Sequence, residues 1–141
     1  MNVEQELRDY LEIRASIAYL ENELNLLRTK KLTDDGRTAV SPSGGYGLPK
    51  QEDGAMDGRI VRLGTKLERK QYTLRKLNAL LSALDERERF VARKYYIEHL
   101  TWRDVVAAYN REMQSPREVD ALKAVRKRML EKIARLQRSC S

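Results

Sequence analysis

Basic side chains on the last predicted helix could contact the phosphates and base edges of nucleic acid. Arginine favours guanine because its planar fork matches two acceptors, whereas lysine more often gives a diffuse contact with phosphate. Where two consecutive helices read DNA, side chains near the N-terminus of the second helix reach base edges and flanking cations hold phosphates. A solvated charged face is the alternative interpretation. The candidate residues on this face are Arg117, Asp120, Lys123, Ala124, Arg126 and Lys127.

The preceding helix would position this face. Residues 100–109, "LTWRDVVAAY", form a short amphipathic segment. Thr101 is well placed as its N-cap because the hydroxyl can accept a hydrogen bond from a backbone N–H. Backbone N–H groups at this helix end, together with Arg103, could meet a phosphate. Thr101, Trp102 and Arg103 are therefore further candidate DNA contacts, although Trp102 could equally anchor a core or an interface.

Three helices are expected in the second half of the chain. The first covers about residues 85–97 and the second about residues 102–109. The third begins at residues 115–118, "SPRE", where an N-cap serine, a proline at the first helical position and a glutamate three residues after the cap form a capping box. The apolar side chains spaced to form a core are Val91, Tyr95, Leu100, Val105, Val106 and Tyr109, followed by the stripe Val119, Leu122, Val125 or Arg126, Met129, Ile133 and Leu136.

The first half of the chain carries two heptad patterns. Residues 2–32 and residues 59–83 each predict a long helix with apolar side chains at two heptad positions. The intervening residues 33–58 hold six of the seven glycines and two of the three prolines, which predicts a flexible loop. We therefore expect an all-α protein with an antiparallel, coiled-coil-like helical hairpin over residues 1–84 and a helix-turn-helix domain over residues 85–138. The loop is long enough to allow pairing between two chains instead.

The positive charge is concentrated in the second half of the chain. The whole sequence has a formal net charge of +7. Residues 1–32 hold five Lys/Arg against six Asp/Glu, and residues 33–58 hold two against five. Residues 59–84 hold seven against one, and residues 85–141 hold fourteen against nine. This asymmetry points to an anionic partner, which is most often nucleic acid.

Several functional classes find no support in the sequence. One histidine and one cysteine leave no zinc-ligand spacing and no Cys/His nucleophile pair, so we expect no enzymatic activity, no metal and no cofactor. Cys140 cannot form an internal disulfide, which favours a reducing compartment. No apolar run is long enough to cross a membrane, and the charged first residues do not resemble a signal peptide. We therefore expect a cytoplasmic protein without a membrane partner.

One ungapped set of residues in the second half of the chain carries a resemblance to a known family. It consists of Leu84, Arg87, Glu88, Arg89, Val91, Tyr96, Leu100, Thr101, Val105, Ala107 and Tyr109. With these residues the segment from Leu84 resembles region 4 of sigma-70-type factors and the related helix-turn-helix of phage transcriptional activators of the RinA/ArpU type. The family usually has a glycine with positive φ before the Leu-Thr pair, whereas this chain has His99, which tolerates that conformation better than most residues. The usual tight turn after the second helix is replaced by the longer "NREMQSP".

The resemblance implies a sequence-specific regulator that binds double-stranded DNA. It would be encoded by a phage or prophage, activate late genes together with the host RNA polymerase, and act in the cytoplasm of a bacterial host. The hairpin would then form a homodimer or contact the polymerase. Two alternatives remain open: a DNA-packaging subunit like a small terminase, which also joins a helix-turn-helix to a helical oligomerisation hairpin, and a sigma-like protein that works mainly by binding RNA polymerase.

Overall fold

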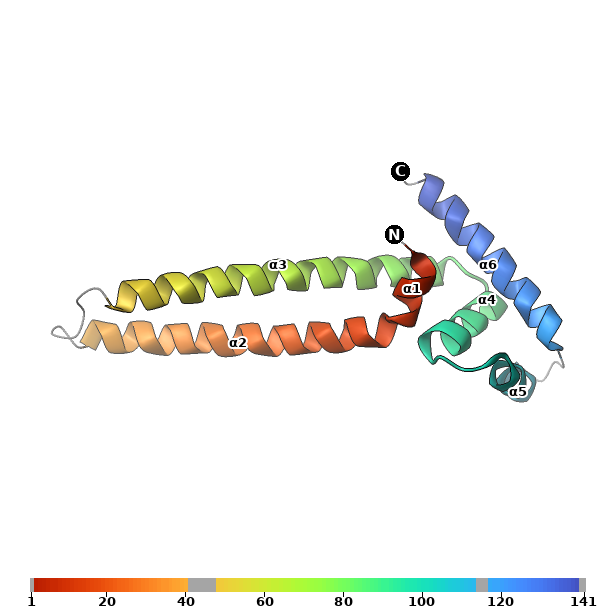
Figure 1. Ribbon diagram of the computed structural model, residues 1–141, viewed down its shortest axis with the longest axis horizontal. Helices are drawn as coiled ribbons and strands as arrows, with labels where there is room; N and C mark the ends of the chain where they lie inside the picture. The colour runs from red at the N-terminus through yellow and green to blue at the C-terminus, as the bar shows by residue number, and fades with distance from the viewer. Residues whose placement is uncertain (1, 41–47, 114–116, 140–141) are drawn as a thin grey trace. The chain divides into compact units, whose positions relative to one another are not determined.

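The expectation of an all-α fold is confirmed. The computed structural model describes residues 2–40, 48–113 and 117–139, and the side chains of these ranges outside residues 33–40 and 48–54. Every regular element in the described ranges is a helix and none is a strand (Figure 1). In chain order they are α1 (Val3–Arg8), α2 (Tyr10–Val40), α3 (Leu48–Ser82), α4 (Glu86–Val91), the π-helix η1 (Ala92–Ile97), α5 (Trp102–Met113) and α6 (Val119–Ser139).

The chain divides into two compact units. Unit 1 comprises residues 1–12 and 74–141, and unit 2 comprises residues 13–73. This division differs from the boundary expected between residues 84 and 85. It differs because α1 and the C-terminal end of α3 take part in the packing of unit 1. Lys76 Nζ donates to Glu6 Oε1 at 3.2 Å, and the hydroxyl of Tyr10 donates to Asn78 Oδ1 at 2.6 Å.

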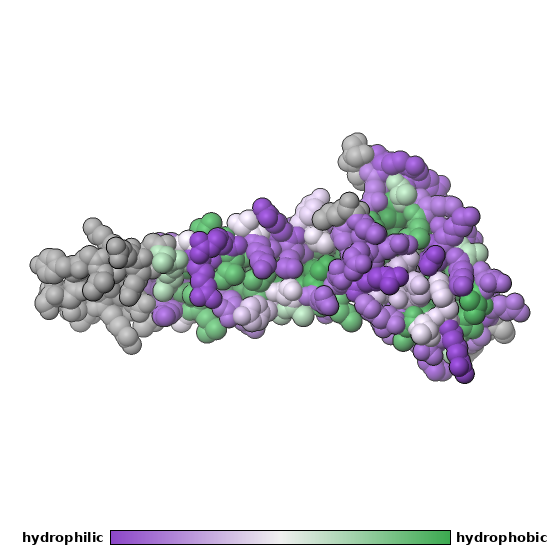
Figure 2. All heavy atoms as spheres, in the orientation of Figure 1, coloured by the Kyte–Doolittle hydropathy of each residue, from purple (hydrophilic) through white to green (hydrophobic). Residues whose placement is uncertain are grey.

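Unit 2 is built from the paired helices α2 and α3. The two helices run in opposite directions, because the residues of α3 that contact Glu23 and Glu21 are Arg59 and Gln71 respectively. Leu20 and Leu24 are buried between the helices, as the heptad pattern predicts. Large apolar side chains also lie exposed on both helices, and Figure 2 shows hydrophobic side chains reaching the surface along this pair. The exposed ones in unit 2 are Tyr19, Leu26, Leu32, Val61 and Tyr72.

The single helix expected over residues 2–32 is interrupted at Asp9. This residue adopts φ −87° and ψ 3°, so α1 ends before it and α2 begins after it. The interruption lets α1 pack against η1 with Val3 and Leu7 buried. Burial of a side chain such as Leu7 contributes roughly 1.5–3 kcal/mol, which exceeds the cost of one altered helical residue. Tertiary packing therefore overrides the uninterrupted heptad pattern here.

Helical structure extends into much of the segment expected to be a loop over residues 33–58. Helix α2 continues to Val40 and α3 begins at Leu48, while residues 41–47 of the expected loop lie outside the described residues. Pro49 is compatible with the first turn of α3 because the N–H groups there have no intrahelical acceptor. An isolated glycine costs a helix only about 1 kcal/mol relative to alanine. The glycines of this segment are therefore not sufficient to end the two long helices.

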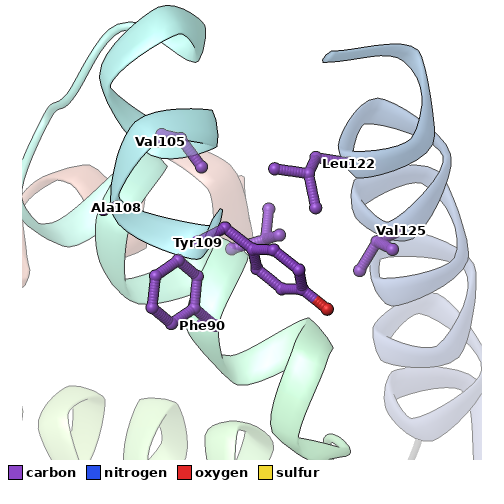
Figure 3. Close-up of a cluster of buried hydrophobic side chains, with 7 residues drawn as sticks. Phe90, Val105, Ala108, Tyr109, Leu122 and Val125 are labelled. Carbon is purple, nitrogen blue, oxygen red and sulfur yellow. The ribbon is translucent and has the colours of Figure 1, made fainter. Parts of the chain in front are cut away.

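The core of unit 1 lies between α4, α5 and α6. Figure 3 shows side chains from all three helices pointing toward one another. The rings of Phe90 and Tyr109 meet edge to face with centroids 5.3 Å apart. On α6, the expected apolar stripe supplies the buried residues Leu122, Val125, Met129 and Ile133. The cluster consists of Phe90, Val91, Val105, Ala108, Tyr109, Leu122 and Val125.

Candidate nucleic-acid interface

Helix α4 begins with a capping box and is tied to α6. Asp85 Oδ1 accepts from the backbone N–H of Glu88 at 2.8 Å, and Glu88 Oε1 accepts from the N–H of Asp85 at 3.0 Å. The first of these hydrogen bonds lowers the pKa of the Asp85 carboxyl. Glu88 is buried and also accepts from Lys132 Nζ at 2.8 Å. The Glu88 carboxylate therefore takes part in the capping box of α4 and also links α4 to α6 through Lys132.

The helix expected over residues 85–97 changes type at its midpoint. Residues 92–97 form the π-helix η1, in which Glu98 N donates to Arg93 O at 2.8 Å instead of to the residue four positions back. The π-helix is rare and occurs mostly as a single turn inside an α-helix. Here the rings of the adjacent Tyr95 and Tyr96 meet edge to face with centroids 5.0 Å apart, and each ring also has a partner of its own. Tyr96 is fully buried and donates its hydroxyl to Glu4 Oε1 at 3.0 Å, while Tyr95 stacks on Trp102.

The turn before α5 has the conformation that the sequence predicts. His99 adopts φ 58°, in the left-handed region that glycine favours and few other residues enter. Its Nε2 donates to the carbonyl oxygen of Arg8 at 2.7 Å, which holds the turn against the end of α1. The N-cap is also confirmed, because Thr101 Oγ1 accepts from the N–H of Asp104 at 3.3 Å. The Thr101 hydroxyl is therefore engaged in capping α5.

Trp102 joins α5 to η1 and α6. Its indole stacks on Tyr95 with centroids 4.3 Å apart and an angle of 21° between the planes. The guanidinium carbon of Arg126 lies 5.7 Å from the centre of each of these rings. On α6, Lys123 Nζ lies 6.0 Å from the indole centre. Each such cation–π contact contributes about 0.5–2 kcal/mol, depending on how dry the pair is.

The guanidinium group of Arg126 lies against the stacked rings of Tyr95 and Trp102. The side chain is half-buried, and its Nε is buried without a hydrogen-bond partner among the described residues. A guanidinium that covers two aromatic rings is poorly placed to present its fork to a base. The structure therefore places Arg126 in contact with Tyr95 and Trp102, apart from the exposed residues of the candidate face.

The exposed face of α6 contains four of the six residues expected there. Asp120, Lys123, Ala124 and Lys127 are exposed, whereas the opposite side of the helix packs in the core. Arg117 differs from its expected position. The helix begins at Val119, and Arg117 precedes it with its N–H donating to Asn110 Oδ1 at 2.8 Å.

The expected capping box of the last helix is not fully described. Ser115 and Pro116 lie outside the described residues. Helix α5 extends four residues beyond its expected end, to Met113, which shortens the connection to α6. Asn110 links the last turns of α5 to the residues just ahead of α6. The longer connection expected from the sequence is thus taken up in part by extra helix.

The part of the candidate face on α6 and the part at the start of α5 come together at Trp102. Lys123 on α6 contacts this indole, and Arg103 lies exposed next to it at the start of α5. The spacing of the apolar residues predicts Tyr95 in the core of this unit. Spacing alone does not reveal which ring lies against which, so the stack of Tyr95 on Trp102 was not predictable. An exposed surface with Arg103, Lys123 and Lys127 can form charge-assisted hydrogen bonds with phosphate oxygens.

Within the described ranges, no group of three or more His, Cys, Asp or Glu side chains is arranged to hold a metal ion. None of the helices among these residues has the length and apolar character needed to cross a membrane. Comparisons with protein-family models, with curated proteins and with solved structures find no match to this chain.

Proposed function

We propose that this protein is a transcription regulator that binds duplex DNA in a sequence-specific manner. In this proposal, α4 to α6 act as a helix-turn-helix domain of the sigma region 4 kind, and α2 with α3 act as the helical hairpin. The supporting observation is the two-sided character of α6. One side is anchored by Leu122, Val125 and Met129, and the other exposes Lys123, Ala124 and Lys127 beside the start of α5.

The residues of this face have different roles in the proposal. Lys123 and Lys127 hold phosphates, and Asp120 and Ala124 face base edges near the start of α6. Arg103 meets a phosphate at the N-terminus of α5, where the helix dipole adds to its charge. Thr101 caps that helix, and Trp102 and Arg126 fix the angle between α5 and α6. Arg117 precedes α6 and is a flanking phosphate contact.

The paired helices α2 and α3 serve a second interaction in the proposal. A pair of helices buries only one seam, and Tyr19, Leu26 and Tyr72 remain exposed away from it. Large apolar side chains outside the seam are typical of surfaces that contact another protein. We assign them to a homodimer or to contact with the host RNA polymerase. The regulator would then act as an activator of phage or prophage genes in the cytoplasm of a bacterial host, without enzymatic activity.

The double variant Lys123→Ala/Lys127→Ala tests the assignment of α6. Each lost phosphate contact flattens the dependence of log K on log[salt] by about 0.9, so the slope should fall in magnitude by about 1.8. The matched control is Arg128→Ala/Arg135→Ala, which removes two exposed arginines from the same helix on a different side. The control should keep the slope of the native protein. Equal slopes for the native protein and the Lys123/Lys127 variant would remove α6 from the DNA interface.

Selection of genomic fragments tests the proposed class of protein. Random fragments of the host and phage genomes are retained on the purified full chain at physiological salt and then sequenced. A single enriched site beside a promoter supports a sequence-specific regulator. Enrichment at a packaging locus supports the terminase-like alternative instead. Retention without any enrichment, combined with co-purification of RNA polymerase, supports the sigma-like alternative.

A further inference from the structure

Four exposed cations follow one another along one side of α3 in unit 2. They are Arg59, Arg62, Lys66 and Arg69, here called the α3 cation row. Successive members are separated by three, four and three residues, which is the spacing that brings side chains onto one side of an α-helix. At a rise of 1.5 Å per residue, the row extends over about 15 Å of the helix. A continuous cationic edge of this length has the size of a macromolecular contact.

The α3 cation row lacks compensating carboxylates. In the part of the chain that the structure describes, Arg59 is its only member in an ion pair, with Glu23 at 3.7 Å. The one carboxylate in residues 59–84, Glu68, lies neither three nor four residues from any member. Like charges at these spacings destabilise a helix. Binding of an anion would reverse that unfavourable contribution.

The row lies on one flank of the α2–α3 pair. Arg59 contacts Glu23, whereas Gln71 contacts Glu21 at 3.4 Å. Residues two positions apart on a helix point about 200° away from each other, so Glu21 and Glu23 occupy opposite flanks of α2. Arg14 and Arg28 each lie seven residues from Glu21 and therefore share its flank. Both are exposed, which provides a pair of arginines outside the row.

We propose that the α3 cation row binds the sugar–phosphate backbone of duplex DNA, as a second contact that does not depend on base sequence. Three of its four members are arginines, whose guanidinium groups match phosphate oxygens in a bidentate manner. One DNA strand presents a phosphate about every 3.4 Å of helix axis, so a 15 Å row faces roughly four phosphates. This inference rests on the proposed function, because it assigns the row to the same ligand as α6.

The test compares three double variants of the full chain with the native protein. Arg62→Ala/Arg69→Ala removes two members of the row, and Arg14→Ala/Arg28→Ala removes two exposed arginines from the other flank. Lys123→Ala/Lys127→Ala reports on α6. Binding to a duplex carrying the selected site and to a scrambled duplex is titrated between about 50 and 200 mM salt, the range over which phosphate contacts dominate the change in affinity.

The expected result separates the row from α6. Loss of Arg62 and Arg69 should lower the magnitude of the salt slope by about 1.8 on both duplexes, leaving the ratio of their affinities unchanged. The Arg14/Arg28 variant should behave as the native protein. If the Arg62/Arg69 variant keeps the salt slope of the native protein while the Lys123/Lys127 variant has a reduced slope, this inference is overturned and the proposed function stands. The α3 cation row would then be assigned to an acidic protein partner.

Three further outcomes are also decisive. If the salt slope falls equally in the Arg62/Arg69 and Arg14/Arg28 variants, the fall reflects only the lower net charge of the protein, and the inference is overturned. A reduced slope for the Arg62/Arg69 variant alone would support the row and contradict the role of α6. Absence of DNA binding by the native protein would overturn both proposals together.

Discussion

The Trp102 indole stacks on the Tyr95 ring at a centroid distance of 4.3 Å, and the guanidinium carbon of Arg126 lies 5.7 Å from the centre of each ring. This contact connects η1, α5 and α6 through side chains alone. Side-chain stacking therefore constrains the angle between α5 and α6 in addition to the backbone that joins them.

Arg126→Ala should weaken the folded state more than it weakens electrostatic attraction to DNA. Loss of two cation–π contacts and of the covering alkyl chain should lower the free energy of unfolding by about 1–2 kcal/mol. Chemical denaturation at neutral pH measures this change, and Lys127→Ala is the control because that side chain is exposed. Unchanged stability together with a flatter salt slope would show that Arg126 is a phosphate contact after all.

Asp85→Ala should destabilise unit 1 in a manner that depends on pH. Loss of this N-cap should lower the free energy of unfolding by about 1 kcal/mol at pH 7. The pKa of Asp85 is lowered in the folded state, mainly by the hydrogen bond from the N–H of Glu88. Its stabilising contribution is therefore present above the unfolded pKa, near 3.9, and is lost as the pH falls through the lower folded value.

The corresponding measurement is denaturation of the native protein and the variant at pH 7 and at successively lower pH below the unfolded pKa of Asp85. The difference between them should shrink at the lower pH because the native carboxyl is then protonated. Asp85→Asn serves as the control, since asparagine also caps helices well and does not titrate. A difference between native protein and Asp85→Ala that stays constant with pH would show that packing, and not the charged cap, carries the effect.

Local chemistry made several features of unit 1 predictable from sequence. The left-handed conformation of His99 and the cap by Thr101 each depend on one residue and its immediate neighbours. The apolar stripe of α6 follows from helical periodicity and is buried as expected, with Leu122 and Met129 almost fully enclosed. Such features depend on short-range geometry, which a single sequence specifies well.

Features that depend on distant contacts were not predictable in the same way. The interruption at Asp9 and the π-helix both arise where α1 packs on η1, more than eighty residues away along the chain. The hydrogen bond from Tyr96 to Glu4 is an example, because neither residue reveals its partner through spacing. The role of Arg126 was unpredictable for the same reason, since its place at the border of the stripe fits either a DNA contact or a stack.

The turn at residue 99 should discriminate strongly between substitutions. His99→Val should lower the free energy of unfolding by about 1–2 kcal/mol, because a β-branched side chain is strained at positive φ. His99→Gly should stay close to the native stability, since relief of the φ penalty offsets the lost hydrogen bond to Arg8 O. Thermal unfolding of the two variants under identical conditions compares them. Equal stability of the two variants would contradict the left-handed conformation of this residue.

Tyr96→Phe should remove both a hydrogen bond and a sensitivity to alkaline pH. The Tyr96 hydroxyl donates to Glu4 Oε1, and its loss should lower the free energy of unfolding at neutral pH by about 1–3 kcal/mol. Burial, together with this hydrogen bond, raises the pKa of the Tyr96 phenol above its ordinary value of 10.0. Because the raised folded pKa favours the protonated form, the stabilisation is complete below the unfolded pKa and is lost as the pH rises above about 10.

Alkaline denaturation distinguishes this account from a purely steric one. The native protein should lose stability between about pH 10 and pH 12, and Tyr96→Phe should lose less over the same interval. Tyr72→Phe is the matched control, since the Tyr72 side chain is 64% exposed. Parallel stability curves for the native protein and Tyr96→Phe above pH 10 would mean that the Tyr96 hydroxyl ionises as readily in the folded chain as in the unfolded one. The contact between η1 and α1 would then rest on the packing of the ring alone.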